Sequence, residues 1–133
     1  MTETPKMPWQ ELRDWSREHG LLAKQLYVVS SRPTNGLGPV LASLDPHVEY
    51  QTSLEREGIM FAAGPLASED LQEWLGEGLF VYRAESMEQA RKYAEDDPMH
   101  ASGARSFTVR EWMLNEGTFS VQLFYSGGKP KIA

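Results

Sequence analysis

The chain has 133 residues, of which 41% are hydrophobic and 24% charged, a composition that fits one globular domain and excludes disorder over most of its length. A formal net charge of -6 without a dense Lys/Arg run argues against partners such as nucleic acid or an anionic membrane. There is no cysteine, no apolar run of membrane-spanning length and no N-terminal secretory pattern, so we expect a cytoplasmic protein without disulfides or thiolate chemistry.

The first half of the chain alternates between strand and helix patterns. Residues 1–7 are expected to be a loose tail, and the next residues a short amphipathic helix that stops at Gly20. The β-branched run 24–31 predicts a strand, and 32–39, rich in Pro, Asn and Gly, predicts a loop. A helix is predicted over 45–57, capped by Asp45 with Val48 and Leu54 inward, and then a strand over 59–63.

The second half repeats this order. After a connector over 67–78, the sequence predicts a strand over 79–84 and a helix that starts at Ser86, with Gln89 as its capping-box partner. That helix is expected to end near Asp97-Pro98. Two further strands are predicted over 106–113 and 118–125.

The element order predicts an α+β fold of the ferredoxin-like, split βαβ kind. Such a fold has an antiparallel sheet with helices on one face, and here it gains an extra N-terminal helix and a C-terminal strand. We expect three regions: a tail and helix over 1–23, the core domain over 24–114, and a strand extension with a tail over 115–133.

A sheet with helices on one side leaves its other face bare. The strands carry more aromatic side chains than one small core layer needs, so we expect several on the open face, where a homodimer would cover them. The alternative is that most of them meet the two helices and that the N-terminal helix covers the rest. The residues concerned are Tyr27, Phe61, Phe80, Tyr82, Phe107, Trp112 and Phe124.

The three histidines are the first candidates for chemistry, because imidazole titrates near neutral pH. His47 lies at the start of a predicted helix, where the helix dipole disfavours the imidazolium and leaves the ring ready to accept a proton. The alternative for His47 is a first-turn residue that only packs. His19 ends a surface helix, where a structural role is favoured.

Asp96, Asp97 and His100 cluster around Pro98. A carboxylate here could orient a histidine, although local sequence alone favours an exposed acidic turn. Two such groups do not make a metal site, and nothing else has ligand spacing, so we expect no metal. No dinucleotide, Walker or nucleophile-elbow motif occurs, and no cofactor is expected.

Taken together, the runs between Lys24 and Met113 resemble the YciI-like branch of the dimeric α/β-barrel proteins. The order and spacing of several short runs carry the resemblance. The runs are PHVEY at 46–50, LEREG at 54–58, FAAGPL at 61–66, FVYRAESMEQA at 80–90, AEDDPM at 94–99 and VREW at 109–112. The loop at 32–39, the N-terminal helix and the 118–125 strand depart from the family pattern.

The resemblance implies a dimer whose sheets pack together, and a pocket with a His-Asp pair at its mouth, here His47 and Asp97. It implies a small cofactor-free enzyme that isomerises, or eliminates a small group from, a ring-derived or lactone-type metabolite. His47 would be the general base or acid, oriented by Asp97. Alternatives are a non-catalytic ligand-binding or accessory dimer of a catabolic pathway, or an assembly subunit. The candidates for binding the small-molecule substrate are Arg32, Tyr27, Arg105 and His100.

Overall fold

A computed structural model describes residues 4–133, and their contacts divide the chain into two units. One unit is Gln25–Trp112. The other joins the described residues up to Lys24 with Met113–Ala133. The predicted tail of residues 1–7 lies partly outside the described residues.

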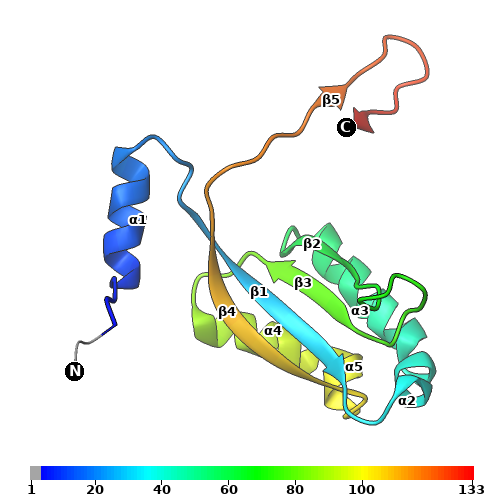
Figure 1. Ribbon diagram of the computed structural model, residues 1–133. Coiled ribbons are helices and arrows are strands. Elements are labelled where there is room, and N and C mark those ends of the chain that lie inside the picture. Colours follow the sequence, from blue (N-terminus) through cyan, green and yellow to red (C-terminus); the bar gives the residue numbers. More distant parts are fainter. Residues whose placement is uncertain (1–3) are drawn as a thin grey trace. The chain divides into compact units, whose positions relative to one another are not determined.

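Helices and strands alternate along most of the chain (Figure 1). In chain order they are α1 (Trp9–Glu18), β1 (Lys24–Pro33), α2 (Leu37–Ala42), α3 (Leu44–Arg56), β2 (Met60–Pro65), β3 (Gly78–Tyr82), α4 (Met87–Asp96), α5 (Pro98–Ala101), β4 (Arg105–Leu114), β5 (Val121–Gln122) and β6 (Lys131–Ile132).

The main sheet has four strands in the order β2-β3-β1-β4. Strand β3 runs antiparallel to both β1 and β2, with Val29 opposite Phe80 and Tyr27 opposite Tyr82. An irregularity between Met60 and Ala62 shifts the register where β2 begins. This strand order, with α3 and α4 as the crossover helices, confirms the predicted split βαβ fold.

The core lies between the sheet and helices α3 and α4, which share one face of it (Figure 1). Side chains alternate across a strand, so Tyr27, Val29, Phe80 and Tyr82 reach the helices together. They meet Leu54 of α3 there, as well as two small residues of α4, Ala90 and Ala94, whose size allows a close approach.

The aromatic side chains therefore do not gather on the open face as we expected. Tyr27, Phe80 and Tyr82 are buried in the core, and Phe107 packs against it. Phe61 and Trp112 are 37% and 40% exposed. The alternation of side chains along a strand explains the difference, because most of the large rings occupy the alternate positions whose side chains face the helices. The alternative prediction, that most of the aromatics meet the helices, describes the molecule better.

Three local predictions around α2 and α3 were wrong. The expected loop over 32–39 contains the start of α2, which Gly36 introduces with a φ of 71° that other residues rarely adopt. Helix α3 follows after the single residue Ser43, so Asp45 lies inside the first turn and is not its cap. Val48 is 49% exposed although it was predicted to point inward, whereas Leu54 is buried as expected.

The start of α4 has the predicted cap. The Ser86 side chain accepts a hydrogen bond from the backbone N–H of Gln89 at 3.1 Å. The Gln89 side chain in turn accepts one from the backbone N–H of Glu85. The candidate site lies at the other end of this helix, next to its C-cap residue Asp97.

In the second unit, Asn115 ties the chain after β4 to the chain after α1. Its side chain accepts from the backbone N–H of Ala23 and donates to Ser16, while its carbonyl accepts from the N–H of Leu22. The predicted strand over 118–125 is reduced to β5, which pairs with β6 and not with the main sheet. The glycine and proline residues between them turn the chain back on itself.

Candidate functional site

Two side chains distant in the sequence meet where α3 faces the junction of α4 and α5. The Nδ1 atom of His47 lies 2.8 Å and 2.9 Å from the two carboxylate oxygens of Asp97. Asp97 has no exposed surface, and His47 is 8% exposed. Buried contacts of this kind bring together a candidate base and the group that orients it.

Further donors hold Asp97 in place. Its side chain caps α5 by accepting from the N–H of Met99 at 2.9 Å, and it accepts from the Gln51 amide at 2.8 Å. Burial by itself would raise the pKa of Asp97, but the hydrogen bond and charge of His47 and these donors hold that pKa below its usual value. Asp97 is thus an anion and not the exposed acidic turn that local sequence favoured.

The charge on Asp97 fixes the tautomer of His47. An ionised carboxylate can only accept, so Nδ1 of His47 carries the proton. In the neutral ring the other nitrogen, Nε2, is then the free base. Among the described residues Nε2 has no hydrogen-bond partner, and His47 lines a cavity.

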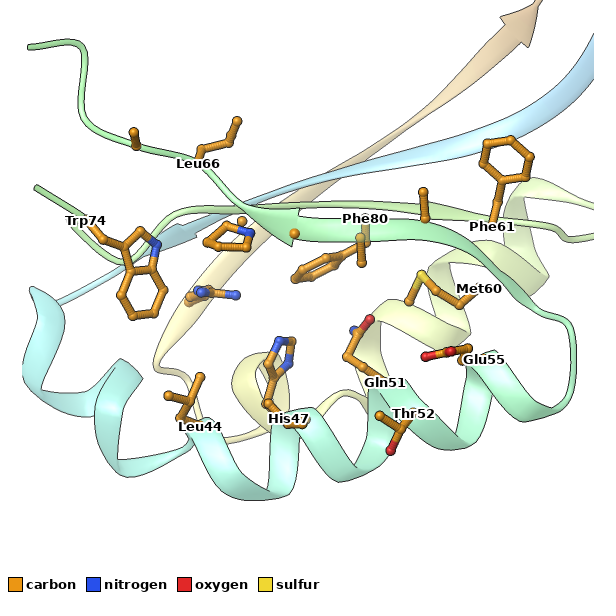
Figure 2. A pocket seen from close by; sticks show the side chains of 18 of the residues that line it. Leu44, His47, Gln51, Thr52, Glu55, Met60, Phe61, Leu66, Trp74 and Phe80 are labelled. Atoms are coloured by element: carbon orange, nitrogen blue, oxygen red, sulfur yellow. The ribbon is translucent and has the colours of Figure 1, made fainter. Parts of the chain in front are cut away.

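That cavity has a volume of about 980 Å³ and lies between α3, β2, the start of β3 and the connector after β2. Figure 2 shows His47 and Gln51 projecting from α3 toward Phe80 on the sheet, with Trp74 near one end and Met60 near the other. The ring centroids of His47 and Phe80 are 5.4 Å apart. An apolar cavity of this size with a few polar groups is typical of small-molecule sites.

Arg105, the first residue of β4, also lines the cavity. It is 4% exposed, and its Nε donates to the carbonyl of Gly76 at 2.7 Å. Burial lowers the pKa of Arg105, and the charge of Asp97 opposes that effect. Gly78 leaves the room for this side chain, because a Cβ there would lie 3.2 Å from the Nη1 atom of Arg105.

His100, the other candidate in this region, is structural. Its Nδ1 lies 2.7 Å from the Ala94 carbonyl, which can only accept, so Nε2 accepts from the Ser31 hydroxyl at 2.6 Å. Burial is the main cause that lowers the pKa of His100, which favours this neutral form. His100 is not among the residues that line the cavity.

Two further predicted substrate contacts lie elsewhere. Tyr27 is in the core, where its hydroxyl accepts from the Gln25 amide. Arg32 is exposed, and it alternates with the buried Ser31, so it points to the other face of the sheet. Of the four candidates for substrate binding, only Arg105 reaches the cavity.

Sequence reasoning missed Gln51 and Trp74. Gln51 follows His47 by four residues on α3, so it lies on the same helix face, and that spacing was a usable signal. Trp74 lies in a connector whose sequence has no helix or strand periodicity, so no sequence signal predicts where its side chain lies. The fold of the connector brings it to the cavity.

Within residues 4–133, no group of three His, Asp or Glu side chains is arranged to hold a metal ion. None of the helices in this range combines the length and the apolar character that crossing a bilayer requires.

Comparisons with known proteins agree with this architecture. The family model described as "YCII-related domain" matches residues 25–113, which confirms the resemblance noted in the sequence. The uncharacterized protein YjpA of Bacillus subtilis (strain 168) is 30% identical over 70 residues, which are 53% of this chain and 75% of that protein.

Two solved structures are also similar. One is 5-chloro-2-hydroxyhydroquinone dehydrochlorinase (TftG) from Burkholderia phenoliruptrix AC1100 in complex with 2,5-dihydroxybenzoquinone. It matches with a TM-score of 0.53 and 17% identity over 65% of this chain and 92% of that one, which supports the fold. The other, protein SO0527 from Shewanella oneidensis, has a TM-score of 0.47 and 15% identity over 73% of this chain and 97% of that one.

Proposed function

The chain belongs to the YCII-related domain family, and we propose that it is a small enzyme that moves a proton on a ring-derived or lactone-type metabolite without a cofactor. The reaction would be an isomerisation or the elimination of a small leaving group. The contact between His47 and Asp97 at the edge of an apolar cavity is the observation that carries this proposal.

In the proposed reaction His47 is the general base. Its Nε2 takes a proton from a carbon next to a carbonyl group, and the electron pair of that C–H bond moves toward the carbonyl oxygen. Asp97 stabilises the imidazolium that forms and keeps the ring in one orientation, as the acidic member of a catalytic triad does. Gln51 and the Met99 N–H are positioning groups, because they act through Asp97.

The second half of the reaction returns the proton or expels a group. In an isomerisation, His47 gives the same proton to another carbon of the substrate. In an elimination, the electron pair returns from the oxygen and forms a double bond, and the leaving group departs with its own bonding pair. The imidazolium of His47 then gives its proton to water or to the departing group. Neither route needs an oxidant or a reductant. The dehydrochlorinase name and the ring-shaped ligand of the similar TftG structure support chemistry of the second kind.

The experiment is a screen of small cyclic ketones, lactones and halogenated hydroquinones in deuterated buffer, followed by NMR. Wild type should exchange a carbon-bound proton or release the leaving group, and His47→Gln should lose about 10²–10⁴-fold in rate, the usual contribution of a general base. His19→Gln is the matched control, because His19 follows the last residue of α1, where it is exposed and stacks on Trp15. Equal rates in wild type and His47→Gln would refute the proposal.

We also propose a homodimer formed through the sheet face that α3 and α4 leave uncovered. Leu79 alternates with Phe80, and Trp112 is three residues beyond the core residue Val109, so both point to that face. They are 37% and 40% exposed. Sedimentation velocity tests this: Leu79→Lys should shift a dimer toward monomer, whereas a wild-type monomer at micromolar concentration would contradict it.

A non-catalytic ligand-binding or accessory dimer is the second candidate function, since the apolar cavity alone would serve it. In that case a ring compound would bind equally well to wild type and His47→Gln, and neither would turn it over.

A further inference from the structure

The cavity contains a buried cation that the proposed proton transfer does not use. Arg105 is 4% exposed, and among residues 4–133 only its Nε has a protein acceptor, the Gly76 carbonyl. Among the described residues, its buried Nη1 atom has no hydrogen-bond partner. A charged donor that is buried and unpaired is strongly unfavourable, so such a group in a cavity indicates a missing acceptor.

No carboxylate of the described residues makes an ion pair with Arg105. Asp97 is the acidic group whose charge stabilises that of the guanidinium, but its oxygens are already engaged by His47, Gln51 and Met99. The acidic residues that line the cavity, Glu55 and Glu73, are exposed to water. The positive charge at the inner wall is therefore left for a ligand.

The surroundings of Arg105 fit a flat ligand. Its guanidinium carbon lies 6.0 Å from the centre of the Phe80 ring, which is also close to His47, and 5.9 Å from the centre of the Trp74 ring. The base and the cation thus approach the same aromatic ring, and all of these side chains line one cavity. A planar ring compound could pack on these faces and present different atoms to His47 and to Arg105.

We infer that the site takes planar ring compounds that carry an oxyanion, and that the Arg105 guanidinium, which lines the cavity, binds this oxygen. This inference rests on the proposed function for the role of His47 and adds the substrate class. The oxygen is either a carboxylate already present on the substrate, or a phenolate or enolate oxygen. In the latter case, the electron pair released by proton removal ends on the oxygen beside Arg105, which stabilises the charge as it develops.

The test compares ligands of one shape and different charge. Calorimetry should show that wild type binds benzoate about 10–100-fold more tightly than benzamide, the effect expected for a hydrogen bond to a charged group. In Arg105→Met this preference should fall to near one, and in Arg105→Lys it should be intermediate. Loosening of the Gly76 contact would weaken both ligands alike, so the ratio separates charge recognition from a folding defect.

A second probe separates the two sources of the oxyanion. 4-Nitrophenol titrates near neutral pH and its phenolate absorbs visible light, so a gain in that absorbance on binding reports stabilisation of the phenolate. Preference for benzoate without this gain indicates a carboxylate substrate, and the gain without the preference indicates a phenolate or enolate. Equal binding of benzoate and benzamide without the gain, no binding of any probe, or an unchanged preference in Arg105→Met would overturn the inference.

His47→Gln distinguishes failure of this inference from failure of the proposed function. The inference expects this variant to keep its preference for benzoate while losing turnover. Turnover that survives His47→Gln refutes the proposed function. The preference for benzoate in wild type and its loss in Arg105→Met would still test the inference about Arg105.

Discussion

Replacing Asp97 by Asn tests the central contact of the site with almost no change of shape. The new amide can still accept from the Met99 N–H, so the cap of α5 survives. Its NH₂ group, however, meets the amide donor of Gln51 where a carboxylate oxygen was. The charge that held the proton on Nδ1 of His47 is also lost.

We expect a loss of about 1.5–3 kcal/mol in the free energy of unfolding, the usual value of a hydrogen bond to a buried charged group. Urea unfolding should measure this as a shift of about 1 M in the midpoint, since m is about 1–3 kcal/mol/M for small domains. Turnover should fall by about 10²–10⁴-fold, because His47 no longer holds its basic nitrogen toward the cavity in a fixed tautomer.

The pH dependence identifies the cause. The pKa of Asp97 is lower in the folded chain than in the unfolded one, so its contribution to stability is present above a pH near 3.8 and is lost as the pH falls through the folded pKa. The gap in stability between wild type and Asp97→Asn should therefore be constant from pH 7 to about pH 4 and shrink below that.

Asp96→Asn is the matched control. Asp96 is the neighbouring residue and pairs with Lys92 at 3.0 Å, but both side chains are exposed. Such a surface pair contributes little to stability, because water and salt screen the two charges. An equal loss of stability and turnover in the two variants, or no loss in Asp97→Asn, would refute the reasoning.

Two other predictions concern residues that support the site. Burial lowers the pKa of His100, so the folded state resists its protonation, and stability should fall as the pH decreases below about 6.5. Thermal unfolding should show a smaller loss of stability at acid pH in His100→Gln than in wild type, and the same loss as wild type in His19→Gln. Gly78→Ala places a Cβ 3.1 Å from the Phe80 ring and 3.2 Å from Nη1 of Arg105, so it should cost about 1–3 kcal/mol in urea unfolding. A Cβ at Gly64 meets nothing within 4 Å, and equal costs at the two glycines would contradict the packing of Phe80 and Arg105 around Gly78.

The sequence was sufficient for the order of elements in the core domain. Period-two runs and helical spacing mark the strands and helices, and local pairs such as Ser86 and Gln89 mark a helix start, because these signals depend on neighbours within a few residues. The predictions of a strand over 118–125 and of a loop over 32–39 were wrong because they also used only neighbouring residues. Whether a strand joins a sheet, and whether a glycine bends the chain into a new helix, depends on partners outside the local window.

The same distinction between local and long-range information applies to the site. Single residues pointed to His47, and the family resemblance paired it with Asp97, but no local pattern shows that residues 50 positions apart are 2.8 Å apart. By itself the sequence determined the fold and named a candidate base. Only the tertiary structure decided that Asp97 is a buried anion, that His100 is held in a structural network, and that Arg105 lines the cavity without an ion-pair partner among residues 4–133. Burial and hydrogen-bond satisfaction decide these roles, and both arise when distant segments pack together.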